Sequence, residues 1–513
     1  MTARCDDRSL EADVLRTSEC GDAASKRPPS RSLLEPLAFD DPWLGAIELF
    51  RTRNPRRLER IAAYEALLAA GEHRRIAAQV LDLRYQPAPP EEAWLNKAGG
   101  RRKRIFRYPP LDELLFRVVN RLLQPAAAEV ASPWCRSFLP GGGARTAFRS
   151  VLIDPTVEAK GCLRLDVRDY FNSIDVEDLL ARPPGAFAEA PVQVLLANAL
   201  RDRRVTRDGR VAVAGRKGVM AGTPLAPLLA TLYLRELDEE IGGTGATYAR
   251  YSDDILVLAT PDELVELERL VRGRLAERGL EVNEAKSAVA APGQPWDFLG
   301  FRYERGAIRL SPATRRKVKA RATRLARALL RWREQTGADA ERTLGAYLRR
   351  TNLRLYGVPE ERADFSWATW FLPLLDCPDD LPGVDGHVQR EARYAASGRR
   401  TTHARTRFPY SALVEAGYYP VHSAYWAWRR TPAEFEEVVA RRTGLHRQRD
   451  ASCCATVWDR DIAASASRPE SSRTTERLSV PRNTSERPSA SSAVCAPPPA
   501  GAGAGAVGGD HAR

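Results

Sequence analysis

Leu163–Arg168 (LRLDVR) is the stretch of sequence that decides the fold. Apolar side chains occupy every second position, which is the period of a β-strand with one buried face, and this places Asp166 on the face opposite Leu165. Asn172 and Ser173, which follow shortly after, are residue types that favour a turn. Taken alone, the pattern is better explained by an edge strand with a solvated aspartate.

A second stretch, Tyr248–Leu258 (YARYSDDILVL), predicts a β-hairpin. Apolar and β-branched residues flank a short polar Ser-Asp-Asp, as in two strands joined by a tight turn. The run Ile255–Leu258 is apolar throughout, as in a strand covered on both faces, and a merely solvated turn would not explain it. Two adjacent carboxylates at the tip of a buried hairpin repel each other, and a bound cation would relieve that repulsion.

Three aspartates therefore become candidates for one site: Asp166, Asp253 and Asp254. Carboxylate oxygens are hard donors that suit Mg²⁺. Two such ions about 3.5–4 Å apart hold the attacking and leaving oxygens of an in-line phosphoryl displacement. We therefore expect these three residues to be catalytic and to bind metal.

Five blocks of sequence resemble, in order and in spacing, the palm of reverse transcriptases, in particular the bacterial set that includes group II intron and defence-associated, domesticated enzymes. The blocks are DVRDYFNSI from Asp166, GVMAGTPLAPLLATLYL from Gly218 with Leu237-Asp238 behind it, YSDD from Tyr251, LEVNEAK from Leu280, and FLGF from Phe298. The resemblance implies an α+β right-hand polymerase fold. Its parts would be a palm sheet, helical fingers and thumb, an extra C-terminal helical region and a disordered tail.

The resemblance also implies roles for the acidic residues and their neighbours. Asp166 and Asp253 would bind both of two Mg²⁺ ions with help from the backbone carbonyl of Val167, and Asp254 would be the more peripheral carboxylate. Phe171 matches the aromatic residue that packs under the incoming sugar and rejects a 2′-hydroxyl; a core phenylalanine is the alternative, and both can hold.

Further nucleotide contacts are implied in the same way. Gly222 would let the backbone approach nucleotide or template, and Lys286 would lie near the triphosphate, with an exposed surface lysine as the alternative. Arg104, in the basic stretch RRKRIFRYPPLD of residues 101–112, resembles a fingers residue that grips template and triphosphate. Arg145 matches more loosely a loop arginine that binds the triphosphate.

The remaining sequence predicts the domain organisation. Val318, Leu325, Leu329 and Trp332 share predicted helices with a series of basic residues, as expected of a thumb with one packed and one cationic face. That series is Arg315, Arg316, Lys317, Lys319, Arg321, Arg324 and Arg327. The expected parts are a mobile leader (1–43), N-terminal helices (44–95), fingers and palm (96–310), thumb (311–360), C-terminal helical region (361–448) and disordered tail (449–513).

Composition excludes several classes of protein. The chain has 513 residues, 43% of them hydrophobic and 28% charged, so it is not collagen-like, coiled-coil or wholly disordered. The net charge of +13 is compatible with a nucleic-acid partner. No run approaches 18 apolar residues and no secretory signal is visible, so we expect a cytoplasmic protein without a membrane span. The eight cysteines and six histidines lack the spacing of a zinc site.

Taken together, the sequence predicts an RNA-directed DNA polymerase, a nucleotidyltransferase that adds deoxynucleotides from dNTPs to a DNA or RNA primer on an RNA template. Met220-Ala221 stands where the family has Pro-Gln, which leaves open an untemplated or protein-primed polymerase. A non-catalytic, maturase-like RNA-binding protein is the other alternative. No Cys/His endonuclease motif follows the thumb, so a host-defence or otherwise domesticated reverse transcriptase is expected by elimination, and the oligomeric state stays open.

Overall fold

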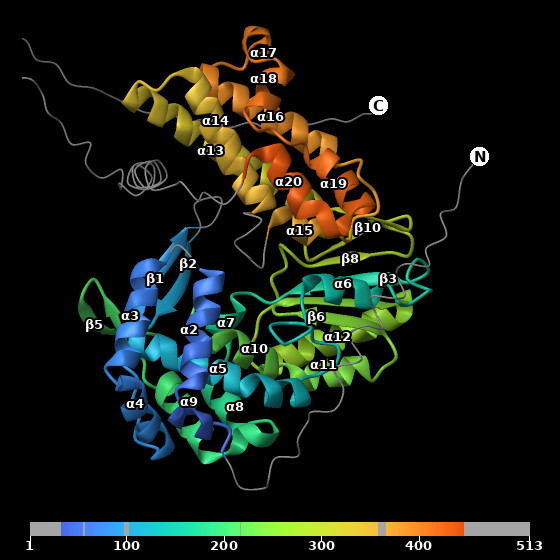
Figure 1. The fold of residues 1–513 in the computed structure, drawn as a ribbon. Helices are drawn as coiled ribbons and strands as arrows, with labels where there is room; N and C mark the ends of the chain where they lie inside the picture. The colour runs from blue at the N-terminus through green and yellow to red at the C-terminus, as the bar shows by residue number, and fades with distance from the viewer. Residues whose placement is uncertain (1–31, 55–56, 97–101, 216, 358–365, 446–513) are drawn as a thin grey trace, which may run out of the picture. The chain divides into compact units, whose positions relative to one another are not determined.

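The computed structural model describes residues 32–54, 57–96, 102–215, 217–357 and 366–445 (Figure 1). Helices and strands are mixed in it, so the predicted α+β class is confirmed. The predicted tail (449–513) and most of the predicted leader lie outside the described residues. Within the described ranges, no helix has the length and apolar character needed to cross a bilayer.

The palm sheet has four strands in the order β6-β7-β3-β8. They are β3 (Gly161–Asp166), β6 (Thr247–Tyr251), β7 (Asp254–Ala259) and β8 (Ala288–Ala290), and all neighbours are antiparallel. Since β3 pairs with strands on both sides, the edge-strand alternative is wrong. In β3 only Arg164 is more than marginally exposed, so the strand is covered more completely than its alternating pattern predicts.

The predicted hairpin is confirmed. Strands β6 and β7 pair with Tyr251 opposite Asp254, which leaves Ser252 and Asp253 as a two-residue turn. Ser252 has a φ of 61°, a left-handed conformation that such a tight turn requires of one of its residues. Ile255–Leu258 is fully buried, as predicted for a strand covered on both faces.

Helices α11 (Arg235–Gly242) and α12 (Pro261–Glu277) pack against the palm sheet (Figure 1). The spacing of apolar residues from Leu229 to Ile241 predicts one continuous helix, but the structure divides it into α10 (Ala226–Tyr233) and α11. The break is at Leu234, which is buried and whose ψ of 15° leaves the helical region. The periodicity persists across the break because both helices bury the same row of side chains.

A second sheet, in the order β2-β1-β4-β5, forms the fingers. Its strands are β1 (Glu91–Asn96), β2 (Arg102–Arg107), β4 (Arg204–Arg207) and β5 (Arg210–Val213). The predicted N-terminal helical region (44–95) therefore ends too late, because its last residues are a strand. That region holds α2 (Asp41–Arg53), α3 (Leu58–Ala69) and α4 (Glu72–Leu81), where the periodicity predicts two helices; α2 and α3 pack against α5 (Pro110–Val130).

The predicted leader (1–43) is wrong for its last twelve residues. Residues 32–43 contain the 3₁₀ helix η1 (Glu35–Ala38) and the start of α2. Leu34, Leu37 and Trp43 are fully buried, and Glu189 accepts hydrogen bonds from the backbone of Leu33. Burial of these three large apolar side chains anchors the segment. The sequence does not predict this, because the segment as a whole contains few large apolar residues.

Shorter elements connect the fingers and palm. They are α6 (Ala144–Val151), α7 (Tyr170–Ser173), α8 (Val176–Ala181), η2 (Gly185–Ala188) and α9 (Ala190–Arg201). A third, antiparallel sheet follows the palm strands and consists of β9 (Trp296–Phe298), β10 (Phe301–Glu304) and β11 (Ala307–Leu310). Phe148 of α6 packs its ring against Trp296 and Phe301 of this sheet.

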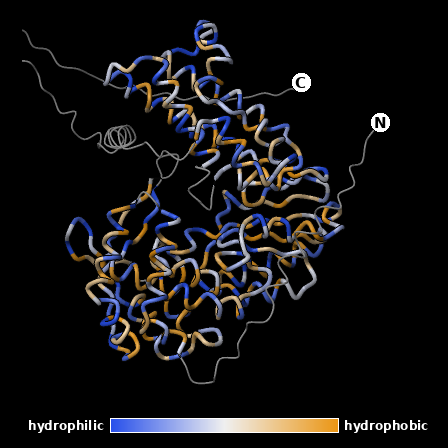
Figure 2. The backbone as a smooth tube through the Cα atoms, viewed as in Figure 1, coloured by the Kyte–Doolittle hydropathy of each residue, from blue (hydrophilic) through white to orange (hydrophobic). Residues whose placement is uncertain are grey.

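Helices α13 (Pro312–Thr336) and α14 (Ala340–Tyr356) occupy the predicted thumb. The four apolar residues predicted to pack in α13 are all buried, and hydrophobic and hydrophilic residues alternate along these helices in Figure 2. Arg315 is an exception in the predicted cationic face, because it pairs with Asp380. The C-terminal region holds α15 (Trp367–Phe371), α16 (Leu381–Ser397), α17 (Thr402–Arg407), α18 (Tyr410–Glu415), α19 (Val421–Arg430), η3 (Pro432–Glu434) and α20 (Phe435–Thr443).

Candidate active site

The palm sheet brings the three predicted aspartates to one edge. Asp166 ends β3 directly opposite Asp254 at the start of β7, and side chains at such paired positions lie on the same face of a sheet. Asp253 is in the adjoining turn, and its carbonyl accepts a hydrogen bond of 3.0 Å from the backbone N–H of Val167. Asp166 is 4% exposed. Antiparallel register therefore joins residues that lie almost ninety positions apart.

Both carboxylate oxygens of Asp166 have partners. Asn283 Nδ2 donates to Oδ1 at 2.8 Å, and Lys286 Nζ lies 2.5 Å from Oδ2. The backbone N–H of Asn283 also donates to the carbonyl of Asp166 at 2.7 Å. The structure thus places Lys286 at the predicted site. Its side chain is 54% exposed but paired, so neither the surface-lysine alternative nor a buried role describes it fully.

The site carries more negative than positive charge. Burial raises the pKa of Asp253, and the charge of Asp166 raises it further. Burial and the charges of Asp253 and Asp166 raise the pKa of Asp254 to about 7, which the positive charge of Lys286 only partly offsets. Each carboxylate therefore makes ionisation of its neighbours less favourable.

The donor set fits a divalent cation in its chemistry. Carboxylate oxygens and the Val167 carbonyl are hard ligands, and burial together with neighbouring negative charge raises the pKa values of Asp253 and Asp254. Among the residues that the structure describes, however, no group of three or more His, Cys, Asp or Glu side chains has the arrangement of a metal site. Lys286 and Asn283 bind the two carboxylate oxygens of Asp166, so these hydrogen bonds would have to break before Asp166 could bind a metal ion.

Phe171 lies on the short helix α7, shortly after Asp166 in the sequence. Its half-buried ring lies 5.3 Å from Lys103 Nζ, and its centroid is 6.4 Å from that of Phe138 and 5.9 Å from that of Tyr170. The Phe171 carbonyl accepts a hydrogen bond from the backbone N–H of Val219. The ring is thus both packed and partly accessible, and its role as a gate stays a prediction.

The basic stretch of β2 projects its side chains to two opposite faces. Lys103, whose ammonium group lies over Phe171, shares a face with Ile105, since side chains alternate along a strand. Arg104 projects from the other face and lies over Phe106. Burial lowers the pKa of Arg203, and the positive charge of Arg104 lowers it further. Of the basic residues on β2, the structure therefore favours Lys103 over the predicted Arg104 as the one beside the gate.

Gly222 is needed for packing between fingers and palm. It has a φ of 99°, and a Cβ there would lie 3.1 Å from both Ile105 Cβ and the Phe106 carbonyl oxygen. The adjacent Ala221 carbonyl accepts a hydrogen bond from the backbone N–H of Phe106 at 2.8 Å. The glycine lets this loop approach β2, whereas the sequence predicts an approach to nucleotide or template.

Arg145 contacts the C-terminal region. It lies at the start of α6, and its Nη1 donates to the carbonyl of Thr369 on α15 at 3.2 Å. Burial and the nearby charge of Arg149 lower the pKa of Arg145. The structure does not place Arg145 against the three aspartates, so its predicted contact with a triphosphate has no support from this geometry.

A buried ion pair holds the turn that carries Asp253, and the sequence gives no role to its members. Arg250 and Asp238 are both fully buried, with Nε and Nη2 of Arg250 each 2.6 Å from one oxygen of Asp238. Arg250 Nη1 also donates to the carbonyl of Ser252 at 3.2 Å. Tyr248 donates to Asp238 at 2.7 Å. Asp238 lies among other charged residues of α11 and Arg250 is one polar position of β6, so no local sequence signal reveals this pair.

The loop before α6 holds the same turn from its other side. Ser137 is fully buried, and its Oγ accepts a hydrogen bond of 2.5 Å from the backbone N–H of Ser252. Phe138 follows it with a φ of 54° and with its ring centroid 5.6 Å from that of Tyr251. The catalytic turn is therefore fixed at the N–H and at the C=O of Ser252.

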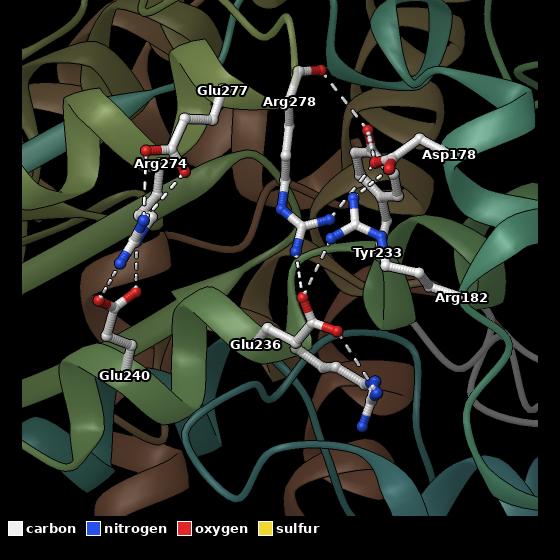
Figure 3. Close-up of polar contacts among 9 residues, drawn as sticks. Asp178, Arg182, Tyr233, Glu236, Glu240, Arg274, Glu277 and Arg278 are labelled. Carbon is white, nitrogen blue, oxygen red and sulfur yellow. Dashed lines mark hydrogen bonds and ion pairs between the residues drawn. The ribbon is translucent and has the colours of Figure 1, made fainter.

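A dense ion-pair network joins the helices beneath the palm sheet (Figure 3). Arg278 and Arg182 both pair with Asp178 and with Glu236, and Tyr233 donates to Asp178 at 2.8 Å. Nearby, Arg274 pairs with Glu240 and Glu277. Burial raises the pKa of Asp178, but the hydrogen bonds from Arg182 and Tyr233 outweigh it, so the pKa is lowered. Each carboxylate here has a cationic partner.

Comparison with known proteins identifies the central part of the chain. Residues 101–303 match the family described as reverse transcriptase (RNA-dependent DNA polymerase). No curated protein matches the chain. Among solved structures, an apo telomerase from Candida tropicalis, truncated from its C-terminal domain, is similar at 12% identity and a TM-score of 0.36. The match covers 44% of this chain and 56% of that one, so the chain spans just over half of the telomerase structure.

The matched region contains the palm sheet, the fingers strand β2 and all nine residues predicted for the site. It begins just before β2 and ends within β10, so the thumb and the C-terminal helices lie outside it. Residues 101–303, less than half of the chain, are therefore similar to the family described as reverse transcriptase (RNA-dependent DNA polymerase).

Proposed function

We propose that this protein is an RNA-directed DNA polymerase that adds deoxynucleotides to a primer by two-metal phosphoryl transfer. The observation that carries the proposal is the group of Asp166, Asp253 and Asp254 at one edge of the palm sheet. These carboxylates repel one another, and a protein keeps such a cluster where a cation or a charged substrate offsets the repulsion.

In the proposed reaction the 3′-hydroxyl of a DNA or RNA primer attacks the α-phosphorus of a dNTP, and pyrophosphate leaves. Two Mg²⁺ ions, when bound, would favour the deprotonated primer hydroxyl and neutralise charge on the leaving group. Asp166, Asp253 and the Val167 carbonyl would hold them, with Asp254 at the periphery. Lys286 would move from Asp166 towards the triphosphate and supply positive charge there.

The surrounding residues would position the nucleotide. Phe171 would lie against the sugar and exclude a 2′-hydroxyl, and Lys103, over the same ring, would contact a phosphate. The buried pair of Arg250 and Asp238 would keep Asp253 in place through Ser252. Geometry of this kind matters because small displacements of a catalytic group reduce the rate strongly.

Primer extension tests the proposal directly. The complete chain, a primer annealed to an RNA of defined sequence, dNTPs and Mg²⁺ should give DNA complementary to the RNA. Sequencing the product with and without added RNA separates templated from untemplated or protein-primed synthesis, for which Ala221 is the motivating residue. A product unrelated to the RNA would contradict the RNA-directed reaction.

A non-catalytic, maturase-like RNA-binding protein is the second candidate, favoured by the cationic face of α13. It predicts RNA binding that weakens with salt and does not depend on Asp166 or Asp253. The finer assignments rest on sequence alone. We propose a bacterial, group II intron-like or defence-associated enzyme acting in the cytoplasm. Loss of phage resistance in cells carrying Asp253→Asn would support the defence role, and unchanged resistance would contradict it.

A further inference from the structure

Phe138 has an unusual position for a large apolar residue. Its side chain is 39% exposed, yet its ring contacts two residues of the candidate site. The ring centroid lies 6.4 Å from that of Phe171, in an edge-to-face arrangement, and 5.6 Å from that of Tyr251. Phe138 is therefore placed between the predicted gate and the strand that leads into the turn of Asp253.

The backbone of Phe138 is held in a conformation that bulky residues rarely adopt. Its φ of 54° lies in the left-handed region, where a Cβ crowds the following carbonyl oxygen. Ser137 is fixed by its hydrogen bond to Ser252, and Gln124 Nε2 lies 3.4 Å from the carbonyl of Phe138. Such conformations persist where surrounding contacts impose them, and they are frequent at functional sites.

Phe171 needs support if it is to reject a 2′-hydroxyl. It belongs to a helix of four residues, and its ring is only half-buried. Lys103 over the ring has a long and flexible side chain, and Tyr170 is its immediate neighbour in sequence. Phe138 is a rigid ring from a distant part of the chain, and an edge-to-face aromatic pair resists displacement of either ring.

We propose that Phe138 is a specificity-determining residue: its ring supports Phe171 and thereby sets the discrimination between deoxynucleotides and ribonucleotides. The inference rests on the proposed function and adds a second residue to the gate. Because Phe138 touches Phe171 and not the carboxylates, it should affect the choice of sugar more than the rate of the chemical step.

The test measures kcat/KM for a dNTP and for the matching rNTP in primer extension with the complete chain. Phe171→Ala should relax discrimination most. Phe138→Ala should lower the ratio of the two kcat/KM values about three- to tenfold, the range that an aromatic pair contributes. Phe138→Tyr keeps the ring and should keep the wild-type ratio. Phe39→Ala removes a ring that is 62% exposed and outside the site, so it serves as the matched control.

Two further variants separate support of the gate from effects on the fold. The double variant Phe138→Ala with Phe171→Ala should discriminate no worse than Phe171→Ala alone, because residues that act through one contact are not additive. Ser137→Ala should lower kcat for both nucleotides and leave their ratio unchanged. Phe138→Leu keeps an apolar side chain and should relax the ratio even if Phe138→Ala folds poorly.

Several outcomes would overturn the inference. A wild-type ratio in both Phe138→Ala and Phe138→Leu would show that the ring does not set the choice of sugar. Additive effects in the double variant would show that Phe138 acts independently of Phe171. A wild-type chain that adds neither nucleotide would instead overturn the proposed function and this inference with it, so the two failures are distinguishable.

Discussion

The carboxylates on the two sides of the palm have pKa values that are shifted in opposite directions. At the edge of the sheet, burial and neighbouring carboxylates raise the pKa values of Asp253 and Asp254, and the charge of Lys286, with that of Arg164 for Asp254, offsets this only partly. Beneath the sheet, Asp178 has a lowered pKa because Arg182 and Tyr233 bind it (Figure 3). Paired charges of the second kind favour the folded state, whereas uncompensated charges of the first kind oppose it and indicate a ligand.

The largest expected effect comes from removing one uncompensated charge. Asp253→Asn should lower nucleotide incorporation by about a thousandfold or more, because an amide cannot replace a carboxylate between two metal ions. Primer extension measures the loss. The same substitution should leave the fold intact, since it relieves repulsion, and circular dichroism checks this.

Asp178→Asn is the matched control, because it changes the same side chain within the balanced network. It should leave incorporation within about twofold of wild type. Comparable losses in Asp178→Asn and Asp253→Asn would mean that both substitutions act through the fold, and the contrast between the two faces would fail.

The next effect concerns the fully buried pair. Arg250→Met leaves Asp238 buried without its partner and should lower the free energy of unfolding by about 3–5 kcal/mol. Chemical denaturation measures it. Replacing both residues by apolar ones, Arg250→Met with Asp238→Leu, should recover most of the stability. A double variant as unstable as the single one would show that the pair is stabilising in itself.

The two faces should also differ in their response to pH. The raised pKa of Asp254 means that its ionisation opposes folding from about pH 3.8 upwards, and this cost increases until about pH 7. In EDTA, the melting temperature of wild type should therefore fall across this interval by a few degrees relative to Asp254→Asn. Added Mg²⁺ should reduce the difference.

Asp178 should show the opposite sign. Its lowered pKa contributes stability that is present above its unfolded value of 3.8 and is lost as pH falls through the folded value. The Asp178→Asn variant should therefore differ most from wild type at neutral pH and least in acid. Parallel pH profiles for Asp254→Asn and Asp178→Asn would contradict the assignment of charge to the two faces.

The smallest effect is the loss of stability in Asp178→Asn itself. Its side chain is 29% exposed, so solvent screens the ion pairs, and we expect a loss of about 1 kcal/mol in the free energy of unfolding. A much larger loss would mean that the network acts as one cooperative unit. Glu437→Gln, which breaks an exposed pair with Arg441 on α20, provides a reference value close to zero.

The palm could be predicted from sequence because its signals are local. The alternation around Asp166 and the apolar run after Asp254 specify strands, and antiparallel pairing then brings the aspartates together. The pairing of β1 with β2 in the fingers could not be predicted from sequence, because β1 (EEAWLN) is too polar to be recognised as a strand. Without it, nothing in the basic stretch indicates that Lys103 rather than Arg104 lies over Phe171.

Residues that act through buried contacts were also missed, for a different reason. Ser137 meets Ser252 across 115 positions and Asp238 meets Arg250 across 12, and each is an ordinary polar residue in its own segment. For Gly222 the sequence predicts an approach to nucleotide or template, whereas the neighbour that requires a glycine in the structure is β2. Local pattern identifies groups that perform chemistry, whereas the supports of those groups depend on tertiary contacts.

The most direct test of the central claim is Mn²⁺ binding followed by electron paramagnetic resonance, with Mn²⁺ standing in for Mg²⁺. If the excess charge at the edge of the palm sheet recruits divalent cations, wild type and Asp178→Asn should bind Mn²⁺ equally. Asp166→Asn and Asp253→Asn should bind at least about tenfold more weakly. Equal affinity in wild type and Asp253→Asn would contradict the account.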